Sequence, residues 1–119
     1  MDISTSISFD GMRSSEALRE TILERTRRLS HFASDILACD VVVSVSEHRH
    51  RHGTPYHVRA RATLRDDVIE VGRPHESSAS HEDPYVAVNQ AFDALRRRIE
   101  DHVRRRRSSI KAHADNAHT

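Results

Sequence analysis

Apolar and polar residues alternate at the start of the chain and then change to a helical spacing. Residues 3–9 place an apolar or β-branched side chain at every second position, between serines, which predicts a short half-buried strand. From about Ser15 to His31, apolar residues recur every three or four positions opposite a charged face, which predicts an amphipathic helix. The segment Ser14-Ser15-Glu16 suits its start, because a serine can cap unpaired backbone N–H groups and an acid favours the helix dipole.

Three strand-like segments follow this helix. Residues 41–45 are rich in valine, residues 56–64 alternate between apolar and mostly basic positions, and residues 68–71 form a shorter apolar run. Gly53-Thr54-Pro55 and Asp66-Asp67 mark turns between them. Consecutive strands joined by short turns predict an antiparallel meander.

A polar loop over residues 75–82 precedes the strongest helical pattern in the chain. Asp83 is a good N-cap, and Pro84 suits the first helical position, where its missing N–H is not needed. Apolar residues then recur at steps of three and four, so we expect a helix that runs to about Arg107. Residues 108–119 are small and polar, and we interpret them as a flexible tail.

The resulting order β-α-β-β-β-α predicts an α+β fold, with a four-stranded sheet and two helices packed on one face, because each helix has one apolar stripe. The length of 119 residues suits one domain, over residues 1–107, followed by the tail 108–119. The single cysteine, Cys39, cannot build a disulfide framework and indicates a reduced, cytoplasmic compartment. No apolar run approaches the roughly 20 residues that cross a bilayer, so no membrane partner is expected.

Positive charge gathers near the C-terminal end. Residues 1–83 carry 11 arginines against 14 acids, a net charge of −3, whereas residues 84–119 carry seven arginines and one lysine against four acids, a net charge of +4. Guanidinium groups suit bidentate contact with phosphate. Several of these arginines have an acid four residues away, so a solvated, salt-bridged face is the alternative interpretation. If both helices share one sheet face, their arginines can border a basic surface that fits a phosphate backbone.

His48, His50 and His52 alternate with two arginines. In an extended segment their imidazoles would share a face, as metal ligands can. The neighbouring guanidinium charges oppose cation binding, so we prefer a solvated polar loop, with a metal site as the alternative. A loop that gains charge as the pH falls towards about 6.5 is a third possibility. No P-loop, nucleophile elbow or zinc-binding helix occurs, so we expect no enzymatic activity, cofactor or small-molecule substrate.

Two segments resemble a known family. The segment 15–19, followed by Arg25, Arg28 and Leu29, is similar to the first helix of the ribosome hibernation-promoting factor family, which includes the ribosome-associated translation inhibitors. Residues 81–89, HEDPYVAVN, resemble the start of that family's second helix. The resemblance covers roughly residues 3–107. It implies a short-form member, without the second domain by which long members pair ribosomes.

The resemblance implies a bacterial stress or stationary-phase factor that binds the small ribosomal subunit near the decoding region and blocks the sites of messenger and transfer RNA. By position, the residues implied in contact with ribosomal RNA are Arg19, Arg25, Arg28 and Arg97. The arginines that lie in the family's basic stretch without matching a fixed residue are Arg98, Arg104 and Arg105. A histidine-rich metal-binding protein and a protein–protein regulator of the sigma-factor modulation type are the alternatives.

Overall fold

The computed structural model describes residues 3–45, 56–73 and 80–117, with side chains described as far as residue 109. The elements in chain order are β1 (Ser4–Asp10), α1 (Glu16–Leu29), β2 (Ile36–Val45), β3 (Tyr56–Leu64), β4 (Val68–Val71), β5 (Ser80–His81) and α2 (Pro84–Ala117). The predicted order β-α-β-β-β-α is therefore confirmed, with the short strand β5 as an addition.

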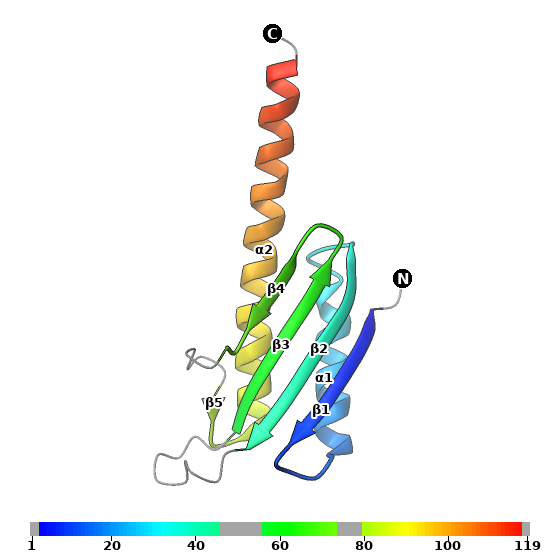
Figure 1. Cartoon of the computed structure of the whole chain (residues 1–119), viewed down its shortest axis with the longest axis vertical. Helices are drawn as coiled ribbons and strands as arrows, with labels where there is room; N and C mark the ends of the chain where they lie inside the picture. The colour runs from blue at the N-terminus through cyan, green and yellow to red at the C-terminus, as the bar shows by residue number, and fades with distance from the viewer. Residues whose placement is uncertain (1–2, 46–55, 74–79, 118–119) are drawn as a thin grey trace.

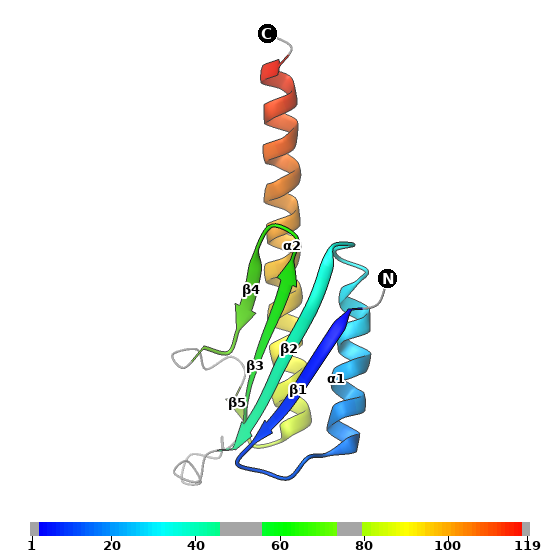
Figure 2. The same cartoon turned by 45° about the vertical axis from the view of Figure 1, so that its right-hand side comes forward.

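The sheet has the order β1-β2-β3-β4, and β5 pairs with the start of β3. The strands β1 and β2 are parallel, as a crossover through α1 requires, whereas β2, β3 and β4 form an antiparallel meander. Both helices lie on the same face of the sheet and run side by side (Figures 1 and 2). This arrangement confirms the predicted α+β fold with two helices on one face.

The core fills the space between the sheet and the helices. Alternate residues of β2 and β3 point into it, and the apolar stripe of α2 covers them. The fully buried side chains with the largest volumes include Phe92, Ile22, Leu95, Ile99, Val41 and Val43. The stripe that predicted α2 is thus the surface that holds it on the sheet.

Both predicted helix starts are confirmed by their capping hydrogen bonds. The Ser15 hydroxyl accepts a hydrogen bond from the backbone N–H of Leu18 at 3.2 Å. The Asp83 carboxylate accepts one from the backbone N–H of Tyr85 at 2.8 Å. Each cap satisfies a backbone donor that has no partner within its own helix.

Two boundaries within the sheet differ from the sequence predictions. The strand β2 begins at Ile36 rather than near Val41, and residues 80–81 pair with β3 instead of remaining in a loop. The imidazole of His57 lies between the Ser80 hydroxyl (2.8 Å) and the Gly72 carbonyl oxygen (2.6 Å), which ties β5 to β3. Ser80 and Gly72 are 23 and 15 positions from His57, so the local sequence pattern does not reveal these contacts.

The predicted end of the second helix near Arg107 is wrong, because α2 continues to Ala117. No glycine or proline follows Arg107 to stop the helix, and the alanines there are strong helix formers. The last turns of α2 extend past the sheet as an arm (Figure 1). The division into a domain over 1–107 and a flexible tail over 108–119 stays a prediction.

Candidate nucleic-acid interface

Arg25 joins the two helices. Its guanidinium donates hydrogen bonds to the Asp93 carboxylate at 2.5 Å and to the Asn89 carbonyl oxygen at 3.5 Å, and lies 6.0 Å from the centre of the Phe92 ring. The Arg25 side chain is only 21% exposed. Its charge is therefore already balanced by a carboxylate of α2, and its first role is to hold α1 beside α2.

A groove of about 370 Å³ runs between the end of α1 and the middle of α2. Its floor is apolar and its rim is mostly basic. The residues that line it are Arg25, Arg28, Leu29, His31, Phe32, Phe92, Asp93 and Arg96. The two predicted arginines of the first helix end thus meet an arginine of the second helix at one place, although Arg96 was not among the predicted site residues.

Arg96 reaches this groove because it lies one helical turn after Phe92, on the side of α2 that faces α1. Its guanidinium carbon is 5.5 Å from the centre of the Phe32 ring, a cation–π distance. It also pairs with Glu100 at 3.2 Å. In the sequence, the spacing of four residues between Arg96 and Glu100 favours a salt-bridged, solvated face. The contact with Phe32 joins two separate elements, so it depends on the tertiary fold.

Arg97 and Arg104 occupy the outward face of α2. Both are exposed and are seven residues apart, and Arg97 follows Asp93 by one turn, so they extend the arginine-bearing surface along the helix. Arg104 pairs with Asp101 at 3.3 Å. Within the described ranges no ion pair is found for Arg97. Arg97 thus lies one helical turn after Asp93, the partner of Arg25, and Arg104 follows two turns later.

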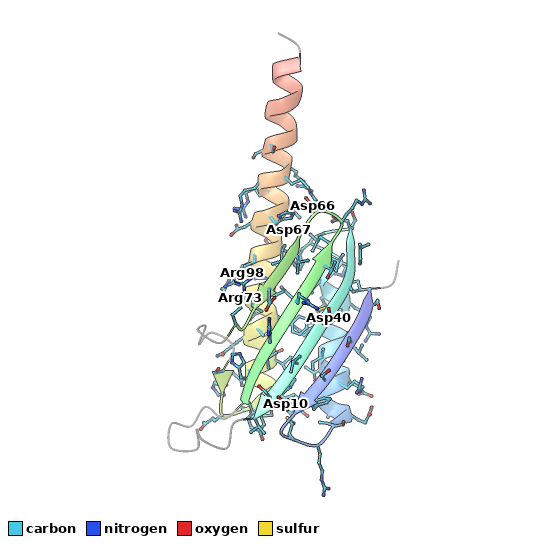
Figure 3. The ribbon with its side chains drawn as sticks, in the orientation of Figure 1. Asp10, Asp40, Asp66, Asp67, Arg73 and Arg98 are labelled. Atoms are coloured by element: carbon cyan, nitrogen blue, oxygen red, sulfur yellow. The ribbon has the colours of Figure 1, made fainter. Side chains whose placement is uncertain are left out.

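Of the seven candidate arginines only Arg25 and Arg28 line this groove, and three others, besides Arg97 and Arg104, lie elsewhere. Arg19 lies 6.0 Å from the centre of the Phe9 ring, on the flank of α1 that faces β1. Arg98 donates a hydrogen bond to the Glu70 carbonyl oxygen, near the end of β4 (Figure 3). Arg105 lines a separate hollow at the β3–β4 turn. Their assignment to RNA contact stays a prediction, and the structure does not gather all seven arginines into one patch.

The basic run of α2 also contains an anchor. Arg106 forms two hydrogen bonds with the carboxylate of Asp35, at 2.8 and 3.2 Å, and a third with Asp66 at 3.2 Å. His102 lies between Asp66 (3.1 Å) and Asp67 (3.6 Å), both at the turn beside α2 (Figure 3). The Arg106 hydrogen bonds lower the pKa of Asp35 against the opposing effect of burial, and the His102 hydrogen bond lowers that of Asp66. This anchor holds α2 where the arm leaves the sheet.

The opposite face of the sheet, which the helices leave uncovered, carries arginines and acids that pair with one another. Its arginines are individually paired across strands, Arg59 with Glu70 at 2.5 Å and Arg61 with Asp40 at 3.3 Å. The serines of β1 fill the adjoining edge. Figure 3 shows Asp40 on this face, so negative charge is interspersed with the positive.

The remaining candidate chemistry is weak. Burial raises the pKa of the Cys39 thiol to about 11, a hydrogen bond with Thr26 acts against this, and the charge of Asp40 adds to it, so Cys39 is no nucleophile. His48, His50 and His52 lie outside the described residues, and within these no group of three or more metal-ligating side chains is found. None of the described helices is both long enough and apolar enough to span a membrane.

Comparison with known proteins gives a clear family assignment. The family model described as sigma 54 modulation protein / S30EA ribosomal protein matches residues 5–107. The N-terminal domain of Protein Y from Thermus thermophilus superposes with a TM-score of 0.66 at 19% identity, covering 86% of this chain and 99% of that one. A ribosomal subunit interface protein from Coxiella burnetii gives 0.69 at 17% identity, covering 84% and 97%. No curated protein sequence gives a significant match.

Proposed function

Since the chain belongs to the sigma 54 modulation protein / S30EA ribosomal protein family, we propose that it binds the small ribosomal subunit near the decoding region and blocks the sites of messenger and transfer RNA. The activity is binding alone, under stress or in stationary phase, and no covalent bond is made or broken. It requires ribosomal RNA as the partner and no cofactor.

The observation that carries this proposal is the meeting of two helices on one face of the sheet. Arg28 and Arg96 border the groove, and Arg97 and Arg104 continue the surface along α2. Planar guanidinium groups bind phosphate oxygens in pairs. A surface with this charge and this spread over two helices supports contact with several phosphates of a folded RNA.

The salt bridges on this surface do not prevent RNA binding. Arg28 pairs with Glu24 and Arg96 with Glu100, and all four side chains are between 39% and 60% exposed. Exposed pairs contribute only about 0–1 kcal/mol, because water and salt screen them. A phosphate that releases counterions can therefore replace either carboxylate as the partner of its arginine.

Co-sedimentation with separated ribosomal subunits tests the proposal. The protein is expected to sediment with vacant small subunits, and messenger RNA with bound transfer RNA is expected to prevent this, because the two would occupy the same space. Sedimentation with large subunits only, or binding to small subunits that bound transfer RNA leaves unchanged, contradicts the proposed site.

The family description also names sigma 54 modulation, which supports a protein partner as the second candidate function. Affinity capture from a nuclease-treated lysate separates the two. Recovery of a sigma factor without ribosomal RNA favours the protein partner, whereas loss of all partners after nuclease treatment favours ribosomal RNA.

A further inference from the structure

The groove between α1 and α2 contains apolar side chains as well as arginines. Binding of a phosphate backbone alone would not require the apolar ones. These apolar side chains, those of Leu29, Phe32 and Phe92, line the groove together with three arginines. We propose that this groove holds one unstacked nucleotide of the RNA, with its base stacked on the guanidinium of Arg96 and its phosphate bound by Arg28. This inference rests on the proposed function, because ribosomal RNA is the source of the nucleotide.

The stacking surface is the Arg96 guanidinium, which lies 5.5 Å from the centre of the Phe32 ring. The Phe92 ring is only 1% exposed, so it supports the floor from below and is not itself a surface for a base. The Arg96 side chain is 45% exposed, which leaves room on the outer side of the guanidinium. Unpaired bases stack on guanidinium planes as well as on aromatic rings.

The charge of the groove favours a nucleotide over a neutral aromatic ligand. Its lining contains three arginines against one carboxylate, and that carboxylate, Asp93, is held by Arg25 at 2.5 Å. The acids that pair with Arg28 and Arg96 do not line the groove. The lining therefore has an excess of two positive charges, which complements the one or two negative charges of a phosphate.

The size of the groove fits a single nucleotide. Its volume of about 370 Å³ lies near the lower end of the roughly 300–1,000 Å³ found for small-ligand sites. A base inside a duplex is stacked on both sides and does not reach such a groove. The partner is therefore a nucleotide of a loop, bulge or strand end rather than of an RNA helix.

The test compares two substitutions that keep the charge. Arg96→Lys retains a cation but removes the planar guanidinium, and Arg61→Lys makes the same change on the open face of the sheet, away from the groove. Affinity for small subunits is measured for both and for Phe32→Leu, which keeps an apolar floor without the ring. Circular dichroism melting of each variant shows that it folds.

If a base stacks in the groove, Arg96→Lys and Phe32→Leu each weaken binding about fivefold or more, whereas Arg61→Lys changes it less than twofold. Wild-type affinity in Arg96→Lys overturns the inference, because a phosphate alone would accept lysine. If the wild-type protein itself does not bind small subunits, the proposed function fails.

A second measurement identifies the source of the nucleotide. Equilibrium dialysis with AMP is expected to show binding much weaker than that of the small subunit, because a free nucleotide brings only the contacts of one groove. AMP binding as tight as that of the subunit overturns ribosomal RNA as the source.

Discussion

Replacing Arg106 by methionine removes the cation that anchors α2 to the sheet while keeping an apolar side chain of similar length. The change leaves the carboxylate of Asp35, only 8% exposed, without the two hydrogen bonds from Arg106 at 2.8 and 3.2 Å, while the one from the Arg65 backbone N–H at 3.4 Å remains. Hydrogen bonds to charged groups contribute about 1.5–3 kcal/mol. Arg106 is 29% exposed and lies near the surface, so screening lowers the expected loss to about 1–2 kcal/mol in the free energy of unfolding.

The pH dependence of this loss follows from the pKa of Asp35, which Arg106 lowers in the folded protein. A lowered pKa means that the ion pair stabilises the fold above the unfolded-state pKa of about 3.9. The stabilisation disappears as the pH falls below that value and through the folded-state pKa. The wild type and Arg106→Met should therefore differ equally at pH 7 and pH 5 and converge below about pH 4.

Urea unfolding followed by circular dichroism at several pH values measures both effects. The double-mutant cycle with Asp35→Asn isolates the pair from the individual substitutions. Equal unfolding midpoints of the wild type and Arg106→Met at pH 7 would show that the Asp35–Arg106 pair does not anchor α2. A difference in their free energies of unfolding that is as large at pH 3 as at pH 7 would also contradict this role.

Two further predictions concern positions that the fold constrains tightly. Gly72 has φ +83°, and a Cβ there would collide with the Val58 carbonyl oxygen. Gly72→Ala should therefore lower the free energy of unfolding, measured in urea, by about 3 kcal/mol or more. A loss below about 1 kcal/mol contradicts this prediction. Cys39 is buried with a raised pKa of about 11, so iodoacetamide should leave the native protein unmodified at pH 8 and label it in urea, and rapid labelling of the native thiol would contradict its burial.

The sequence predicts the fold well because local periodicity carries most of the information. The apolar stripe ending at Val103, the alternation in residues 56–64 and the caps at Ser15 and Asp83 each define an element that is confirmed. These signals act within a few residues, so no knowledge of distant partners is needed.

The arginines were harder to assign, because their roles depend on how the helices sit on the sheet. Arg106 has no acid four residues away along the helix, and its partner Asp35 is 71 positions distant. Arg96 has an acid at that spacing and seemed occupied, yet it lies over Phe32 and lines the groove. Spacing along one helix predicts neither contact, since both join separate elements.

Under the proposed function, ribosomal RNA contacts the helix side of the molecule through the exposed arginines of α2. The salt dependence of small-subunit binding tests it with Arg97→Gln/Arg104→Gln against Arg59→Gln/Arg61→Gln, which removes the same charge from the open sheet face. Losing two phosphate contacts should reduce the log–log salt slope by about 1.4–1.8 in the first variant and leave the second near wild type. An equal reduction in both variants, or a larger one in the second, contradicts the claim.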